Sequence, residues 1–284
     1  MLYKNILETI KINHYLKNII IFIPLLLSSD YNKPSIIFIS FITFIAFCFI
    51  SSSVYIFNDL IDINSDIKHP IKRNRPIAGK KITEKSAVFL FLIFLIFSIT
   101  ISYFINIRCL ILICSYFILN IFYSLFLKKI AFVDIICIAI GFILRIEAGY
   151  ISINQAKSIT LILLIFFTSL FVTSIKRKLE FMLSKQTGFY RESIQKLAYD
   201  RIEKLIDINL YLVLIFYFLL MFQLKNIYAY ITLFPFLLIM LRLKNITNNV
   251  TNNDDPMFFI INDNIIKYLF VFYVIFLFLY VYTK

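Results

Sequence analysis

The chain has 284 residues, of which 61% are hydrophobic and only 16% are charged, and its formal net charge is +13. A water-soluble domain of this size could not cover so much apolar surface, so the composition excludes an ordinary soluble fold and indicates a membrane protein. With only two His, the chain offers little for a zinc site.

Apolar runs long enough to cross a bilayer, at about 20 residues each, recur along the chain. They lie near residues 16–29, 35–57, 86–105, 109–127, 131–151, 158–175, 206–223, 227–242 and 266–282. We therefore predict an all-α, polytopic bundle of nine transmembrane helices, folded as a single integral membrane domain over residues 1–284. No cleavable signal is expected, because residues 1–17 are polar and no small-residue cleavage site follows.

The distribution of Lys and Arg predicts the orientation of the bundle. Most of these cations fall in the N-terminal segment and in alternate loops, above all in residues 68–85 and 176–204. Cations expected on the opposite side are Lys33, Arg108, Lys157, Lys225 and Lys284. Since loops rich in Lys and Arg stay in the cytoplasm, we expect a cytoplasmic N-terminus and an external C-terminus.

Residues 58–76, NDLIDINSDIKHPIKRNRP, directly follow the second apolar run and begin a long polar loop, which we expect over residues 58–85 on the cytoplasmic side. The acids in this segment are spaced i, i+3 and i+7, which places them on one face of a helix. Hard oxygen ligands suit Mg²⁺, which binds a few carboxylates together with substrate phosphates. The predicted ligands are Asn58, Asp59, Asp62 and Asp66, and the cations that would hold phosphates are Lys72, Arg73 and Arg75. The alternative is a solvated amphipathic loop between two membrane helices.

A second charged loop, residues 176–205, begins with KRKLE directly after the sixth apolar run. Lys176 and Glu180 are four residues apart and are expected to face the same way on a helix. Lys176 and Arg177 would donate to phosphates, and Glu180 would bind a metal or a ribose. The alternative is a structural ion pair that caps the end of the helix.

The fifth apolar run carries a third group of polar residues. Asp134, Gly141 and Arg145 are seven and then four residues apart, so they lie near one helix face. Because charges are costly inside a membrane, they are expected to face an interior cavity. The alternative is a structural pair between Asp134 and Arg145. Further polar residues that could reach the same cytoplasmic mouth are Lys17, Asn18, Tyr123 and Lys128.

Together these groups predict a pocket at the cytoplasmic membrane interface, lined with acids for Mg²⁺ and with cations for phosphates. Such a pocket would support the departure of a diphosphate neutralised by a metal and by Arg and Lys. One substrate should be a long lipid, since two soluble substrates would not need nine helices. The four Cys have no metal-ligand spacing, and no Walker, G-x-S-x-G or dinucleotide motif occurs.

The motif ND-x-x-D-x-x-x-D that begins at Asn58 resembles the first aspartate motif of the UbiA-type intramembrane prenyltransferase superfamily. Nine helices fit that fold, and the resemblance covers essentially the whole chain. Residues 69–78, HPIKRNRPIA, resemble the branch of decaprenyl-phosphate phosphoribosyltransferases. Other matching segments are Lys17-Asn18, Tyr123-Ser124…Lys128, Asp134…Gly141…Arg145 and Lys176-Arg177…Glu180.

One departure from the pattern of the prenyl-transferring members decides which branch of the superfamily the chain resembles. Prenyl-transferring members usually carry a second aspartate-rich motif after the sixth helix, whereas KRKLE has one acid among three cations. The resemblance therefore implies a Mg²⁺-dependent glycosyltransferase in the inner or plasma membrane of a bacterium. It would transfer 5-phosphoribose from phosphoribosyl diphosphate to a polyprenyl phosphate and release diphosphate.

The resemblance also implies roles for the site residues. Metal ligands would be Asn58, Asp59, Asp62 and Asp66, and Asp134 and Glu180 would contact a second metal or the ribose hydroxyls. Substrates would be bound by Lys17, Asn18, Lys72, Arg73, Arg75, Tyr123, Lys128, Arg145, Lys176 and Arg177. No nucleic acid is expected as a partner, and a homo-oligomer is left open.

Two other functions remain as alternatives. The first is transfer of a prenyl group from an isoprenyl diphosphate to an aromatic or other small acceptor on the same fold. The second is a non-catalytic lipid or ion transporter, whose intramembrane charges would line a pathway. A transporter predicts charges on the external side as well, and few are found there.

Overall fold

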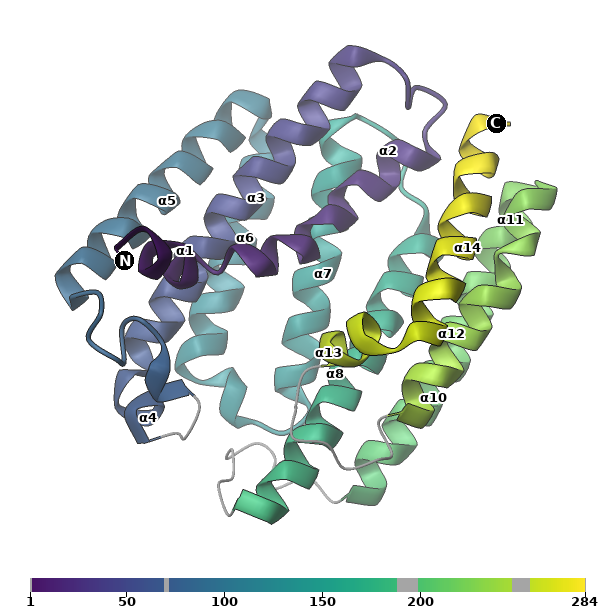
Figure 1. The fold of residues 1–284 in the computed structure, drawn as a ribbon. Helices are drawn as coiled ribbons and strands as arrows, with labels where there is room; N and C mark the ends of the chain where they lie inside the picture. The colour runs from purple at the N-terminus through teal and green to yellow at the C-terminus, as the bar shows by residue number, and fades with distance from the viewer. Residues whose placement is uncertain (1, 69–71, 188–198, 247–255, 284) are drawn as a thin grey trace. The chain divides into compact units, whose positions relative to one another are not determined.

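The computed structural model describes residues 2–68, 72–187, 199–246 and 256–283, and these form helices joined by short connections (Figure 1). No strand occurs in these ranges. The long helices are α3 (Pro34–Ile61), α5 (Glu84–Ile105), α6 (Ile107–Leu125), α7 (Val133–Ser152), α8 (Ile159–Thr187), α10 (Tyr199–Leu224), α12 (Leu233–Ile246) and α14 (Asn264–Tyr282).

Within the described residues, eight helices are long and apolar enough to cross a membrane, and α11 (Ile227–Ile231) together with α12 counts as one of them. A ninth span is added if a bent pair near the N-terminus counts as one. Large apolar side chains such as Phe38, Phe104 and Phe278 stay exposed on these helices, as expected where the surrounding solvent is lipid. The predicted all-α, polytopic membrane protein is confirmed.

The bent pair replaces the first predicted span. Helix α1 (Leu2–Ile10) ends at Lys11, whose φ of 54° and ψ of 53° are left-handed. The chain then continues as the 3₁₀ helix η1 (Ile12–Phe22) and as α2 (Ile23–Leu27), at 45° to α1. The apolar pattern pointed to a short span at residues 16–29 extended by the amphipathic stretch before it, but it gave no sign of the bend at Lys11.

Two helices extend beyond their apolar runs. Helix α3 continues past residue 57 to Ile61, and α8 continues past residue 175 to Thr187. The prediction of loops that begin at residues 58 and 176 is therefore wrong at those positions. A helix satisfies its own backbone hydrogen bonds, so it can carry charged residues out of the apolar layer without a break. Residues 188–198, also part of the second predicted loop, lie outside the described ranges.

The chain divides into two compact units, and α7 contributes to both. Unit 1 contains Met1–Lys128 and Gly141–Lys157, and unit 2 contains Lys129–Ile140 and Ser158–Lys284. The single catalytic domain expected from the sequence stays a prediction.

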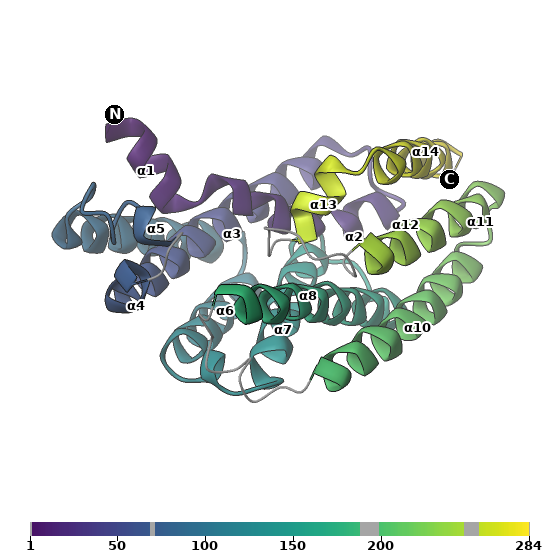
Figure 2. The ribbon, with the colours of Figure 1, turned by 60° about the horizontal axis from the view of Figure 1, so that its bottom comes forward.

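Helix α3 is the centre of unit 1 and packs against α5, α6 and η1 (Figures 1 and 2). Ile21 of η1, Phe47 and Ile50 of α3 and Ile113 of α6 are fully buried in one core. Gly149 of α7 permits η1 to approach closely, because a Cβ there would lie 2.3 Å from the carbonyl oxygen of Ile21. η1 is thereby held between α3 and α7.

Unit 2 is built on the packing of α8 against α10, with α12 against α14 and the short α13 (Pro256–Asn262) against both α12 and α14. Tyr217 of α10 joins these layers. Its hydroxyl shares a 2.7 Å hydrogen bond with Thr232, and its ring stacks on Phe236 at 3.7 Å between centroids. Such a buried aromatic contact stabilises the junction between α10 and α12.

Candidate active site

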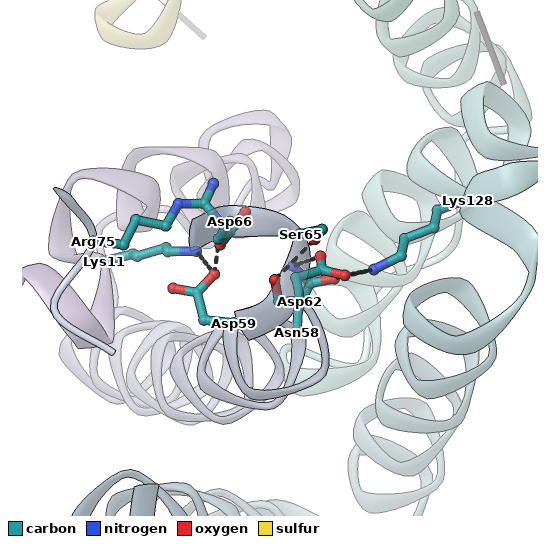
Figure 3. Close-up of polar contacts among 8 residues, drawn as sticks. All are labelled: Lys11, Asn58, Asp59, Asp62, Ser65, Asp66, Arg75 and Lys128. Atoms are coloured by element: carbon teal, nitrogen blue, oxygen red, sulfur yellow. Dashed lines mark hydrogen bonds and ion pairs between the residues drawn. The ribbon is translucent and has the colours of Figure 1, made fainter. Parts of the chain in front are cut away.

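The acidic residues lie where α3 ends and the short helix α4 (Ile63–Lys68) begins. Asp59 is on the last turn of α3, Asp62 is its C-terminal cap with φ −89° and ψ 2°, and Asp66 is in the first turn of α4. Because the helix breaks at Asp62, the acids do not share one face as predicted. Figure 3 shows Asp59 and Asp66 with Arg75 on one side, and Asn58 and Asp62 with Lys128 on the other.

Asp59 and Asp66 converge on one nitrogen. Nη1 of Arg75 donates to Oδ1 of Asp59 at 3.0 Å and to Oδ2 of Asp66 at 2.7 Å, and both acids are buried. Nζ of Lys11 also donates to Oδ1 of Asp59, at 2.7 Å. Burial raises the pKa of the Asp66 carboxyl, although the Arg75 guanidinium favours its charged form. Lys11 was not predicted from the sequence.

Asn58 and Asp62 form the second pair of oxygen donors. Nζ of Lys128 lies 2.5 Å from Oδ1 of Asp62 and 3.4 Å from Oδ1 of Asn58, and Nδ2 of Asn58 donates to Oδ2 of Asp62 at 3.1 Å. Lys128 belongs to the 3₁₀ turn η3 (Leu127–Lys129) after α6. The structure therefore brings together Asp62 and Lys128, which are 66 positions apart in the sequence.

The loop after α4 positions Arg75. The 3₁₀ turn η2 (Lys72–Asn74) leads into it, and Ile77 and Ile82 are buried against α3 and α5 on either side of Gly79. A Cβ at Gly79 would lie 3.1 Å from the carbonyl oxygen of Arg75, so the turn leaves little room for a side chain. Two other cations of this segment were predicted to hold phosphates. Of these, Arg73 is exposed and Lys72 is half-buried. The motif residues 69–71 lie outside the described ranges.

This donor set fits Mg²⁺ held together with a substrate. Among the described residues, no group of three or more His, Cys, Asp or Glu side chains could hold a metal by itself. Instead, Asp59 and Asp66 contact Arg75, with Lys11 also at Asp59, and Asn58 and Asp62 contact Lys128. Mg²⁺ is usually bound by one or two carboxylates plus phosphate oxygens and water, not by a cage made of protein alone.

Arg145 of α7 forms a separate buried group in unit 1. It donates from Nε to Oδ1 of Asn18 at 2.7 Å, from Nη1 to the carbonyl oxygen of Gly141 at 2.8 Å, and from Nη2 to the Tyr116 hydroxyl at 2.7 Å. Its guanidinium carbon also lies 4.7 Å from the centre of the Tyr116 ring. All these partners are neutral. Arg145 is not paired with Asp134, as one interpretation of the sequence suggested, because eleven helical residues separate them by about 16 Å.

Arg145 is linked to the acids through α3. Its partner Asn18 also contacts Ser51 and Cys48 of α3 at 3.4 Å. Ser51 precedes Asn58 by seven residues, which is about 10 Å along a helix and returns to nearly the same face. Arg145, a buried cation with neutral partners, is therefore connected through Asn18 to the face of α3 that carries Asn58, about two helical turns before the acids. Of the other predicted residues in unit 1, Lys17 is exposed on η1 and Tyr123 is half-buried on α6.

In unit 2, Arg177 of α8 lies between two carboxylates. Its Nε is 2.7 Å from Oδ2 of Asp134, and its Nη1 is 2.5 Å from Oε2 of Glu180. Arg177 and Asp134 are both buried. Glu180 thus pairs with Arg177, three residues before it, and not with Lys176 as expected. The reason is that Arg177 is the residue whose side chain points inward to Asp134. Lys176 is half-buried.

The fold and the acidic motif place the chain in a class of intramembrane transferases. It belongs to the UbiA prenyltransferase family, whose model matches residues 19–272. A UbiA homologue from Archaeoglobus fulgidus, solved bound to GPP and Mg²⁺, has the same fold, with a TM-score of 0.71 over 98% of each chain at 15% identity.

Within that family, the chain is similar to decaprenyl-phosphate phosphoribosyltransferases. The one from Mycolicibacterium smegmatis is 33% identical over 147 residues, which are 52% of this chain and 46% of that protein. The one from Corynebacterium glutamicum is 31% identical over 189 residues, which are 64% of this chain and 56% of that protein. The chain thus spans about half the length of these relatives in the matched regions. The predicted resemblance to this family and branch is confirmed.

Proposed function

We propose that this protein transfers 5-phosphoribose from phosphoribosyl diphosphate to a polyprenyl phosphate and releases diphosphate, with Mg²⁺ as cofactor. The observation that carries the proposal is the presence of two separate cationic groups in unit 1. One surrounds the acids at the end of α3, and the other is Arg145 with its neutral partners. The names of the relatives at 31% and 33% identity support the same donor and acceptor.

Two cationic groups suit a reaction with two separated anionic groups. The acids and cations at the end of α3 fit a diphosphate, while Arg145 fits a phosphate monoester, either the 5-phosphate of the donor or the phosphate of the lipid. A buried Arg with neutral partners is costly in a membrane, and an anionic substrate group would offset that cost. An isoprenyl diphosphate has no second anionic group of its own, so in prenyl transfer only the acceptor could supply one.

The proposed roles follow from these contacts. Asn58, Asp59, Asp62 and Asp66 would hold Mg²⁺, which would neutralise charge on the departing diphosphate. Arg75 and Lys128, already beside those oxygens, would donate to the phosphates. The bond from ribose C1 to the diphosphate breaks as a phosphate oxygen of the lipid bonds to C1. No general base is required, because the lipid phosphate is an anion at neutral pH.

The residues of unit 2 have a structural role of their own in the free protein. Arg177 already pairs with both Asp134 and Glu180. Substrate binding by Lys176 and Arg177, and ribose or metal binding by Asp134 and Glu180, stay predictions. We further propose a bacterial inner or plasma membrane location, with the N-terminus and the active site on the cytoplasmic side where a soluble donor is available.

Prenyl transfer to a small acceptor is the second candidate, since a protein of the same fold was solved with GPP and Mg²⁺. Competition and donor-exchange experiments distinguish phosphoribosyl transfer from prenyl transfer. We expect ribose 5-phosphate to inhibit at millimolar concentration, because it carries the terminal phosphate that a phosphoribosyl site must bind. Geranyl diphosphate, offered as the donor with 4-hydroxybenzoate as the acceptor, should yield no product. Product formed from geranyl diphosphate, together with no inhibition by ribose 5-phosphate, would favour prenyl transfer.

A further inference from the structure

Lys11 is the one cation at the acids that the sequence pattern gave no reason to expect there. It lies at the 45° bend between α1 and η1, and its backbone is left-handed although it is not Gly. Left-handed backbone is costly for a residue with a Cβ, and such strain persists where surrounding contacts impose it. Here the hydroxyl of Ser52 donates to the carbonyl oxygen of Ile10 at 2.9 Å and ties the bend to α3.

From that bend the side chain reaches Asp59. Nζ of Lys11 lies 2.7 Å from Oδ1 of Asp59 and 5.2 Å from the centre of the Tyr55 ring, and the side chain is only 15% exposed. Arg75 donates to the same oxygen at 3.0 Å (Figure 3). Two cations therefore share one carboxylate oxygen, while Oδ2 of Asp59 takes part in neither contact.

Each of the three acids is paired with at least one cation in the free protein. Lys11 and Arg75 offset Asp59 and Asp66, and Lys128 offsets Asp62. A metal ion that arrived alone would have to bind beside these cations and compete with them for the same oxygens. A metal that arrives with a diphosphate brings its own acceptors, to which the displaced ammonium and guanidinium groups can donate.

We propose that Lys11 is a substrate-positioning residue that weakens binding of a lone divalent cation to the acids and favours binding of the cation together with a diphosphate. In the free protein its ammonium group donates a hydrogen bond to Asp59. When the two ligands bind, the ammonium group donates to a phosphate oxygen instead. The inference rests on the proposed metal and diphosphate site. It does not depend on which diphosphate ester is the donor, since inorganic diphosphate is a product of either candidate reaction.

The test measures ligand binding to the purified full-length protein in nanodiscs, without turnover. Binding of Mn²⁺ is followed by electron paramagnetic resonance, and binding of inorganic diphosphate at fixed Mn²⁺ by calorimetry. For Lys11→Met we expect Mn²⁺ alone to bind about tenfold more tightly, because a competitor is gone. Diphosphate should bind about tenfold more weakly, because a charge-assisted hydrogen bond is lost.

Lys33→Met is the matched control, since Lys33 forms an exposed ion pair with Asp30 in the same unit, and it should change neither affinity. If Lys11→Met does not fold, Lys11→Gln removes the same charge and keeps a donor. A purely structural ion pair would lower thermal stability without tightening Mn²⁺ binding. Unchanged or weaker Mn²⁺ binding in a folded Lys11 variant overturns the proposal. If the wild-type protein binds neither Mn²⁺ nor diphosphate, the proposed function itself fails.

Discussion

Replacing Asp62 by Asn should lower turnover at least about a hundredfold, as expected when a ligand of a catalytic metal is lost. The change keeps the size of the side chain and its contact with Asn58, and it removes the charge that now pairs with Lys128 at 2.5 Å. Metal and diphosphate should both bind more weakly. The measurement is product formation by purified protein across a Mg²⁺ titration, with expression compared by quantitative blotting.

Asp30→Asn provides the control for this change. Asp30 forms an exposed ion pair with Lys33 in the same unit, and exposed pairs contribute about 0–1 kcal/mol. That variant should keep wild-type turnover. Near-normal turnover of Asp62→Asn at saturating Mg²⁺ would remove Asp62 from the active site.

Arg177→Ala should cost about 3–5 kcal/mol of stability, because it removes the cationic partner from a buried ion pair with Asp134. Asp134 is fully buried, and Arg177 Nε is 2.7 Å away. The double change Asp134→Asn with Arg177→Gln removes both charges and should recover much of the loss. Thermal unfolding of the detergent-solubilised variants measures both effects.

Arg242→Ala is the control in the same unit. Arg242 pairs with Asp263 at 3.0 Å, but its side chain is 42% exposed, so its loss should cost less than about 1 kcal/mol. If Arg177→Ala keeps the wild-type unfolding temperature and instead raises the KM for the donor, Arg177 binds substrate and the structural assignment is wrong.

The membrane helices could be predicted from the sequence because a span of about 20 apolar residues is a local signal. Their polar ends could not. Asn58, Asp59, Arg177 and Glu180 were assigned to loops because hydropathy falls there, yet a helix continues as long as its backbone hydrogen bonds are satisfied. The short elements α4, η2 and η3 depend on tertiary contacts that no local pattern contains: α4 packs against α3, η2 packs against α4, and η3 contacts α3 through Lys128.

The residues of the acidic cluster were identified from the sequence, and Arg75 and Lys128 were named as cations of the same site, but the third partner, Lys11, was not predicted. Lys11 is a lone cation in an amphipathic stretch, 48 residues before Asp59, and nothing in its neighbourhood distinguishes it from Lys17. The pairing of Arg145 with Asn18 spans 127 positions. Such contacts depend on how η1 packs between α3 and α7, which is a tertiary property.

The most direct test of the proposed reaction is transfer of label from phosphoribosyl diphosphate to lipid. Membranes that contain the protein, and matched membranes that contain Asp62→Asn, are incubated with phosphoribosyl diphosphate labelled in the ribose, polyprenyl phosphate and Mg²⁺. We predict labelled lipid and stoichiometric diphosphate with the wild-type protein and almost none with the variant. Prenylated 4-hydroxybenzoate formed from an isoprenyl diphosphate, with no label moving from phosphoribosyl diphosphate to lipid, would contradict the account.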